Sequence, residues 1–353
     1  MCVIHYQNNC LNDLAKVLKS YITEKQNIYL LSDNNVSALY LNKILKTLKK
    51  SYKSVYVFIV KAGEQSKSLT QFEAFTRYLI THNAQRNSII INLGGGVVSD
   101  LGGFVAASYM RGINYINIPT TILAQIDASI GGKTAINFHN TKNIVGAFHK
   151  PLAVIIDTSF IQTLPQKEQL SGWGELFKYF VLTGDFGITE FLPKINSDDY
   201  LTITQHCINY KQKLVEEDLH DKGLRQILNL GHTAGHGLEV SYGLPHGIAV
   251  AIGILVATQI SCSLNLCTKE LKQNIYSVYN NLFSNICLPV EGEINKLFNI
   301  IKSDKKKTSH NSLNFILPIA LGKVIIKEVK DEIWQKQVEL MVNKLQPKEI
   351  SNE

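Results

Sequence analysis

The chain has 353 residues, of which 45% are hydrophobic and 18% are charged, and its formal net charge is +7. This length exceeds what one hydrophobic core usually serves, so we expect two domains. The composition is typical of a globular enzyme. The lysines form no single long block, which argues against a nucleic-acid-binding arm, whereas a moderate positive charge suits a small anionic substrate.

Cysteines and apolar segments bear on where the protein works. The six cysteines include no CxxC pair, so we expect buried, reduced thiols in a cytoplasmic protein and no cysteine zinc site. The first residues, MCVIHYQNNCLNDL, lack the basic start and apolar core of a signal peptide. The longest apolar run, Ile248 to Ile260, is too short to span a bilayer and predicts a buried helix.

The first half of the chain predicts a parallel sheet. Its β-rich runs are apolar on both faces, as in a sheet covered on both sides, and they lie at 27–33, 54–60, 88–96, 113–120 and 152–159. Helix-length segments such as LTQFEAFTRYLITH separate them. From about Pro165 helical patterns dominate, with one late β-like pair, LNFILPI and KVIIKEV. We therefore predict a Rossmann-like α/β domain over 1–164 and a mainly α-helical domain over 165–353.

A glycine turn follows one of these strands. Gly94–Gly96 come directly after the run SIIINL and precede helix-forming residues. A helix N-terminus with a close backbone suits the diphosphate of a dinucleotide. The stretch does not match GxGxxG, so a plain strand-to-helix turn is an equal alternative. Asp33, at the end of the first strand run, lies where an acid often meets a ribose hydroxyl.

A second polar group surrounds another glycine turn. Asp127 is embedded in apolar and small residues, Gly131 and Gly132 precede Lys133, and Lys142 and Asn143 follow. An acid and lysines near glycine turns predict convergence on an anion site.

Six polar residues of the second half are spaced by 3, 4, 4, 3 and 4, which predicts one face of a helix: Asp218, Asp221, Arg225, Asn229, His232 and His236. Three glycines fall in or beside this stretch, at 231, 235 and 237. Each costs about 1 kcal/mol relative to alanine inside a helix, so their presence indicates that something packs closely there. We favour a functional face over a solvated one.

The histidines suggest a metal site. A catalytic zinc usually has three protein ligands and one open position. His232 and His236 lack the glutamate of HExxH, which excludes that metalloprotease motif. The other choice is His232 with His246 and a carboxylate, for which Glu175 is the candidate. Lys178 lies three residues after Glu175, so a structural ion pair is an alternative that spacing alone does not decide.

Six motifs, in order, resemble the 3-dehydroquinate synthase family of the sugar-phosphate cyclase superfamily: GGGVVSDLGGFVAASYMRG, PTTILAQIDASIGGKTAIN, KNIVGAFHKP, TLPQKE, GELFK and LRQILNLGHTAGHGLE. They extend from about residue 30 to residue 310 and so cover most of the chain. The resemblance implies a dehydroquinate synthase-like fold, NAD and one divalent metal (Zn²⁺ or Co²⁺) as cofactors, and a homodimer.

The resemblance also implies site residues. The metal ligands are Glu175, His232 and His246. The NAD-binding set is Asp33, Glu64, Lys67, Gly94, Gly95, Gly96, Asp100, Thr120, Thr121, Lys133, Lys142, Thr163 and Leu164. The substrate-binding set is Arg111, Lys133, Asn143, Lys178, Lys211, Arg225, Asn229, His236 and either Lys305 or Lys306. The catalytic set is Asp127, Lys133, Lys178, Arg225, Asn229 and His236, and Arg111 reaches the neighbouring subunit's site.

The implied reaction belongs to the shikimate pathway of aromatic amino-acid biosynthesis. It converts 3-deoxy-D-arabino-heptulosonate 7-phosphate to 3-dehydroquinate and phosphate by transient oxidation with NAD, phosphate elimination, reduction and aldol closure. The enzyme would be a cytoplasmic carbon–oxygen lyase. Three alternatives stand beside it: another sugar-phosphate cyclase, a metal-dependent polyol dehydrogenase, and a non-catalytic ligand-binding remnant.

Departures from the family's pattern mark particular positions. Ile248 replaces a glutamate usual after His246-Gly247, so a partner of the metal histidine is lost or replaced. Gly174 stands where alanine is common, and Asp221 where glutamate is common. Ser99 and Gly102 stand where glycine and alanine are frequent.

Overall fold

The computed structural model describes residues 2–7, 9–139, 141–184, 197–284, 286–289, 294–304 and 311–346. The chain divides into two compact units. The first comprises Met1–Leu164 with Tyr200–Gln212, and the second comprises Pro165–Asp199 with Lys213–Glu353. The inclusion of Tyr200–Gln212 in the first unit was not predicted.

The first unit is built on a parallel sheet. Over the described residues its strand order is β1-β8-β5-β4-β2-β3, and every pairing is parallel. The bounds are β1 (Val3–Tyr6), β2 (Ile28–Asp33), β3 (Val55–Val60), β4 (Ile89–Gly94), β5 (Asn114–Pro119) and β8 (Ala153–Ile156). The predicted strand runs are therefore all present. β1 has no counterpart among them, because four residues are too few to show a pattern.

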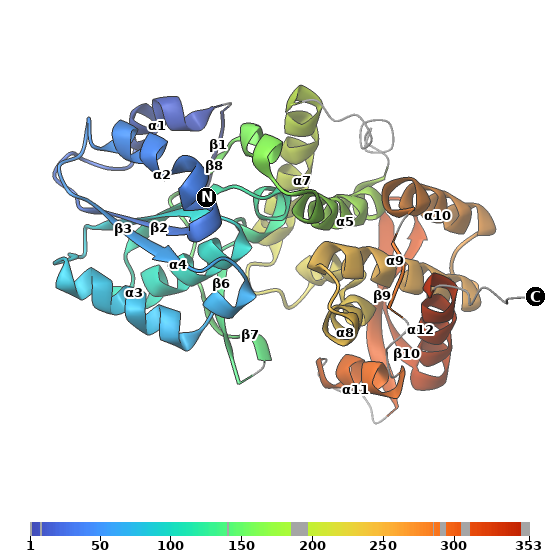
Figure 1. Cartoon of the computed structure of the whole chain (residues 1–353). Coiled ribbons are helices and arrows are strands. Elements are labelled where there is room, and N and C mark those ends of the chain that lie inside the picture. The colour runs from blue at the N-terminus through green and yellow to red at the C-terminus, as the bar shows by residue number, and fades with distance from the viewer. Residues whose placement is uncertain are drawn as a thin grey trace, which may run out of the picture. The chain divides into compact units, whose positions relative to one another are not determined.

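Helices cover both faces of this sheet, as Figure 1 shows. Alternate side chains of β2 separate the two cores: Ile28 and Leu30 pack with the first pair of helices, Tyr29 and Leu31 with the second. The pairs are α1 (Cys10–Leu18) with α2 (Asn34–Leu48), and α3 (Leu69–Thr81) with α4 (Gly96–Ser108). β3 is only partly buried, because it is the edge of the sheet.

A hairpin and a piece of a later helix complete the first unit. The hairpin joins β6 (Lys133–Phe138) and β7 (Thr141–Phe148), and most of β7 is exposed. The added piece belongs to α7 (Ser197–Glu217), whose Ile208 packs with Ile130, Val154 and Ile156.

The second unit is mainly helical. Its elements are α5 (Gln166–Thr183), α8 (His232–Tyr242), α9 (His246–Ser263), α10 (Lys269–Phe283), α11 (Ile294–Asp304), α12 (Asp331–Leu345) and the antiparallel pair β9 (Ser312–Ala320) and β10 (Lys323–Lys330). α9 packs against α5, α8, α10, α12 and β9 (Figure 1). The predicted fold class, a Rossmann-like domain with a mainly helical one, is confirmed.

The apolar run forms the middle of α9. Among the described helices, α9 is the one long and apolar enough to cross a membrane, yet 78% of its residues are buried within the protein. The predicted buried helix is confirmed, although it is longer than the apolar run.

The cysteines differ from the prediction. Cys262 and Cys267 form a disulfide, because the turn after α9 brings their Cα atoms to 5.0 Å. Cys287 is exposed, whereas Cys10 and Cys207 are buried and free. The expectation of buried, reduced thiols is therefore wrong for Cys262, Cys267 and Cys287.

Candidate active site

Three helices of the second unit bring an acid and two histidines together. Glu175 lies in α5, while His232 and His246 are the first residues of α8 and α9. Oε1 of Glu175 lies 3.7 Å from Nε2 of His232 and 3.4 Å from Nε2 of His246. The second carboxylate oxygen of Glu175 forms an ion pair with Nζ of Lys178, and both side chains are fully buried.

This group fits a divalent metal. Two ligands held at about 2.1 Å in tetrahedral geometry are separated by roughly 3.4 Å, which is close to both measured Nε2–Oε1 distances. The three ligand atoms all lie within 4.8 Å of one another. Two imidazoles and one carboxylate are a donor set used by catalytic zinc, with a fourth position left for substrate. The ion pair between Glu175 and Lys178 does not exclude this reading, because it uses the other carboxylate oxygen.

Glycines allow the helices to approach this closely. A Cβ atom on Gly174 would overlap the carbonyl oxygen of Gly247, and one on Gly247 would overlap that of Ser171. α8 meets α9 in the same way, with Gly253 against the carbonyl of Gly231. Gly174 therefore has a packing reason in this chain, even though alanine is common there in the family.

Burial and charge set the protonation of the two histidines in opposite directions. Burial lowers the pKa of His232 to about 3, against the attraction of Glu175, so its imidazole is neutral and able to bind a metal. Burial also acts to lower the pKa of His246, but its interactions with the carboxylates of Glu175 and Glu239 outweigh burial and raise that pKa to about 9. Metal binding at neutral pH must therefore release a proton from His246.

The predicted single helical face is wrong. α7 ends at Glu217, a 3-10 helix η5 covers Leu224–Asn229, and α8 begins only at His232. The helical conformation is interrupted because Leu230 is extended (ψ 129°) and Gly231 adopts a left-handed φ of 81°.

The glycine signal in this segment was correct. Gly235 lies against the backbone of Ala249, and a Cβ atom on Gly237 would be 2.5 Å from a side-chain carbon of Ile301 in α11. Neighbouring helices therefore do pack closely at these two positions.

The polar residues of this segment lie in different elements of the second unit. Arg225 is buried, and its Nη1 donates to the carbonyl of Leu219 at 2.8 Å. Asn229 ends η5. The ring of His236 lies 5.3 Å from that of His232 and 6.0 Å from that of His246. His236 is thus beside the candidate metal ligands.

In the first unit, the glycine turn lies at the point where the order of the strands in the sheet reverses. From β2 the chain runs outward to β3 and returns to β4 on the other side of β2. Dinucleotides bind outside the carboxyl ends of parallel strands at such a point. Asp33 ends β2 and Gly94 ends β4, while Gly95 precedes the first turn of α4. Thr120 lies beside the turn, since its N–H donates to the carbonyl of Gly94 at 3.0 Å.

Charged side chains of the predicted NAD set are tied to neighbours within this unit. Nζ of Lys67 lies 2.5 Å from Oδ2 of Asp100 in α4. Oε1 of Glu64 accepts a hydrogen bond from Asn137 at 2.8 Å. The carboxylate of Asp33 caps α2, accepting from the N–H groups of Asn35 and Val36. Asp33 therefore has a structural role whether or not it meets a ribose.

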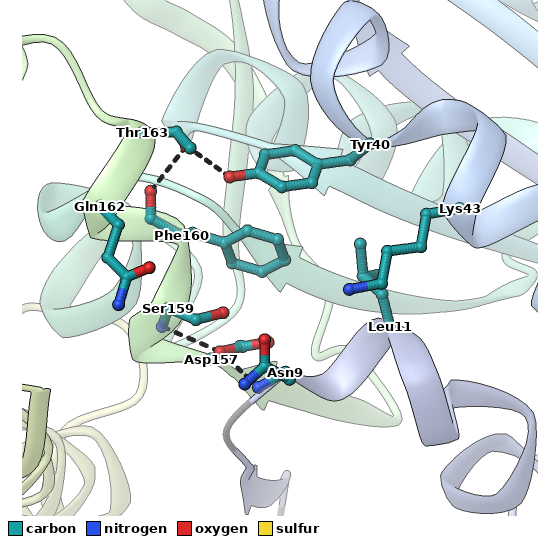
Figure 2. Close-up of a pocket in the computed structure, with 9 residues that line it drawn as sticks. All are labelled: Asn9, Leu11, Tyr40, Lys43, Asp157, Ser159, Phe160, Gln162 and Thr163. Atoms are coloured by element: carbon teal, nitrogen blue, oxygen red, sulfur yellow. Dashed lines mark hydrogen bonds between the residues drawn. The ribbon is translucent and has the colours of Figure 1, made fainter.

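A cavity of about 140 Å³ lies beside Thr163 (Figure 2). Thr163 ends the 3-10 helix η4 (Thr158–Thr163), and Leu164 follows it in an extended conformation. Asp157 fixes this helix, accepting from the N–H of Ser159 at 2.9 Å and from that of Cys10 at 2.5 Å. The hydroxyl of Tyr40 is hydrogen-bonded to that of Thr163 (Figure 2). These hydrogen bonds around the cavity therefore fix the segment that contains Thr163, a member of the predicted NAD set. The lining residues are Asn9, Leu11, Tyr40, Lys43, Asp157, Ser159, Phe160, Gln162 and Thr163.

The predicted anion site is only partly assembled. Nζ of Lys211 in α7 forms an ion pair with Asp127 and also donates to the Asp127 carbonyl at 2.6 Å. The hairpin register pairs Lys133 with Phe148 and Phe138 with Thr141, so Lys133 lies at the opposite end of the hairpin from Lys142 and Asn143. The register alone does not bring these lysines together, and their convergence on an anion stays a prediction.

The remaining predicted residues are Arg111, Thr121, Lys305 and Lys306. Arg111 is exposed and, like Met110, has a positive φ in a short 3-10 turn. Thr121 lies beside the glycine turn, because a Cβ atom on Gly95 would be 3.1 Å from its Cγ2. Its hydroxyl accepts a hydrogen bond from the N–H of Ala124. Lys305 and Lys306 lie outside the described residues.

Sequence reasoning missed one residue of this site. Oε2 of Glu239 lies 2.9 Å from Nδ1 of His246. The one signal was a carboxylate three residues after His236 on the same helix.

The family models account for most of the chain. The model described as 3-dehydroquinate synthase N-terminal matches residues 57–171, and the one described as 3-dehydroquinate synthase C-terminal matches residues 172–307. The chain belongs to the 3-dehydroquinate synthase family. A 3-dehydroquinate synthase from Alkaliphilus oremlandii is 38% identical over 351 residues, 95% of this chain and 94% of the relative. One from Clostridium tetani is 37% identical, covering 96% of this chain and 92% of the relative.

Solved structures share the fold of this family. A 2-deoxy-scyllo-inosose synthase complexed with carbaglucose-6-phosphate, NAD⁺ and Co²⁺ has a TM-score of 0.87 at 24% identity, covering 95% of both chains. ValA, a 2-epi-5-epi-valiolone synthase from Streptomyces hygroscopicus subsp. jinggangensis with NAD⁺ and Zn²⁺ bound, has a TM-score of 0.83 at 22% identity, covering 98% of this chain and 96% of that one.

Proposed function

We propose that this protein converts 3-deoxy-D-arabino-heptulosonate 7-phosphate to 3-dehydroquinate and phosphate, as a phosphate-eliminating carbon–oxygen lyase. One observation carries the proposal. A member of the 3-dehydroquinate synthase family, matched over both of its domains, brings together an acid and two histidines at separations that suit one divalent metal.

Glu175, His232 and His246 would hold Zn²⁺ or Co²⁺. When bound, such an ion acts as a Lewis acid on the substrate's hydroxyl and carbonyl oxygens. Lys178 lies against Glu175, where its ammonium group offsets the buried negative charge and offers a donor to an anionic substrate. His236, next to both metal histidines, is the side chain we assign to proton transfer.

The first unit would hold NAD at the carboxyl ends of β2, β4 and β5. When bound, NAD supplies reversible hydride transfer, and the protein supplies position and electrostatics. The turn at Gly94–Gly96 leads into the N-terminus of α4, whose N–H groups suit a diphosphate. Asp100, in this helix, forms an ion pair with Lys67. The positions of Asp33, Gly94–Gly96 and Thr120 at this edge of the sheet support the proposal.

Anionic groups of the substrate would meet basic side chains. Arg225, buried in the second unit, suits the carboxylate, because a guanidinium pairs with it in a bidentate fashion. Asn229, Lys133, Asn143 and Lys211 also belong to the set that family membership implies, as do Arg111 and Lys305 or Lys306. Lys211 is already held beside Asp127.

We also propose a homodimer. Large apolar side chains are exposed on the β6–β7 hairpin, namely Phe138, Ile144, Val145 and Phe148, and Met110 next to Arg111 is exposed as well. Apolar surface of this kind favours burial against a partner. The substitutions I144D and V145D should convert a dimer into a monomer in light scattering. A wild-type monomer at micromolar concentration would contradict this proposal.

Because NAD and phosphorylated sugars are made inside the cell, we place the enzyme in the cytoplasm.

The decisive experiment supplies the heptulosonate phosphate and NAD⁺ to the full chain with Co²⁺ and follows phosphate and absorbance at 340 nm together. Phosphate release without accumulated NADH is expected, since the hydride returns within each turnover. A chelator and the substitution E175Q should each abolish the release. Net NADH with a polyol would indicate a dehydrogenase, phosphate release only from sedoheptulose 7-phosphate or glucose 6-phosphate would indicate a sister cyclase, and neither product would indicate a ligand-binding remnant.

A further inference from the structure

Two carboxylates contact opposite nitrogens of one imidazole. Nε2 of His246 lies 3.4 Å from Glu175, while Nδ1 lies 2.9 Å from Oε2 of Glu239 in α8. The side chain of Glu239 is 14% exposed and that of His246 is 29% exposed, so solvent only partly screens the contact. His246 is thus held from both sides.

A histidine that binds a metal through Nε2 must carry its proton on Nδ1. A carboxylate that accepts this proton's hydrogen bond fixes the tautomer and the ring plane and raises the basicity of Nε2. His232 has a weaker counterpart, since its Nδ1 lies 3.2 Å from the neutral carbonyl oxygen of Leu230. The two histidines therefore differ in the group that contacts Nδ1, which is a charged carboxylate for His246 and a neutral carbonyl for His232.

The usual glutamate after His246-Gly247 is absent, because position 248 is an isoleucine with 4% exposure. We propose that Glu239 is a positioning residue: its carboxylate accepts a hydrogen bond from the Nδ1–H of His246 and so aims Nε2 at the metal. The proposal rests on the metal ligands assigned above. It assigns to Glu239 a contribution to metal affinity without making it a ligand.

Distance separates this role from direct ligation. His236, Glu239 and His246 also have ligand atoms within 4.8 Å of one another. Ligand atoms on one tetrahedral ion are separated by roughly 3.4 Å, whereas the Nδ1–Oε2 distance of 2.9 Å is that of a hydrogen bond. The pair with Glu175 has the wider spacing that a shared ion requires.

The test measures Co²⁺ affinity and the visible d–d absorption of bound Co²⁺ on the full-length protein after a chelator has stripped it. E239A should weaken Co²⁺ binding roughly 10- to 100-fold, the range for loss of such a partner, with the absorption bands unchanged because all three ligands remain. E239Q keeps an oxygen that accepts the hydrogen bond but lacks the charge, so its affinity should lie between that of E239A and the wild type. V240A, at an exposed neighbouring position of α8, should bind like the wild type.

Each outcome has one reading. Wild-type affinity in both Glu239 variants would overturn the positioning role and leave the metal ligands untouched. Shifted absorption bands in E239Q would make Glu239 a ligand and also overturn the proposal. If E239A fails to fold, E239Q still decides, because it preserves shape. A wild-type protein that binds no Co²⁺ would overturn the metal centre itself, and this inference with it.

Discussion

At the scale of single residues, the Lys67–Asp100 pair links the predicted NAD site to stability. Burial raises the pKa of Asp100, and the nearby Lys67 ammonium acts against that rise. Removing one partner of a buried ion pair leaves a charge without compensation and typically costs about 3–5 kcal/mol. We expect K67M to destabilise the protein by about 3 kcal/mol at pH 8.

The pH dependence of that loss has a definite sign. Without Lys67, the folded-state pKa of Asp100 rises further above its unfolded value of about 3.9, so the folded protein binds the proton more tightly. The stability deficit should therefore be fully present at pH 8 and shrink as the pH falls toward 4. Urea unfolding of K67M, of the wild type and of the exposed control K61M at both pH values checks this. A deficit that grows toward acid pH would contradict it.

Residue patterns gave part of the candidate site and left the rest open. Glu175, His232 and His246 were candidates on chemistry, but spacing did not distinguish a metal ligand from an ion pair at Glu175. The structure places Lys178 on one oxygen of Glu175 and the histidines near the other, so an ion pair and a metal ligand are compatible at Glu175. Glu239 was missed because its contact with His246 depends on how α8 crosses α9.

At the scale of elements, the crossing of α5 and α9 sets the metal geometry. Gly174 precedes Glu175, and a Cβ there would overlap the Gly247 carbonyl, next to His246. Relief requires the two helices to separate. We expect G174A to lose about 1–3 kcal/mol of stability, as other overpacked cores do, and to weaken Co²⁺ binding, because the crossing carries two of the three ligands. Thermal unfolding and Co²⁺ titration measure the two effects, with the exposed α5 variant K167A as control. Wild-type Co²⁺ affinity in G174A would contradict the argument.

At the scale of elements, helices and strands could be predicted where the hydrophobic period was clear. The prediction failed where single residues change the direction of the chain. The parallel strands were clear because apolar residues filled both faces. The polar stripe from Asp218 to His236 fitted a helical period, yet Leu230 and Gly231 break it. A glycine's left-handed conformation is not visible in a spacing pattern. The β6–β7 hairpin was also missed, because its strands carry mixed polar and apolar residues on exposed faces.

At the scale of the whole molecule, each unit carries one predicted cofactor set. The NAD set lies in the first unit, and the metal ligands lie in the second. The boundary near Leu164 followed from the change of pattern, whereas the return of Tyr200–Gln212 to the first unit depends on contacts of residues such as Ile208 that no local pattern reports.

This division predicts separable thermal stabilisation. A ligand at about 100 times its Kd stabilises the folded state by about 2.7 kcal/mol, which corresponds to several degrees for a unit of this size. NAD⁺ and Co²⁺ should each raise the unfolding midpoint of the wild type. E175Q should lose the Co²⁺ shift and keep the NAD⁺ shift. G95V, which adds a side chain at the predicted diphosphate turn, should lose the NAD⁺ shift and keep the Co²⁺ shift, and the retained shift shows that each variant is folded. A Co²⁺ shift that survives E175Q would mean that the metal binds to other groups.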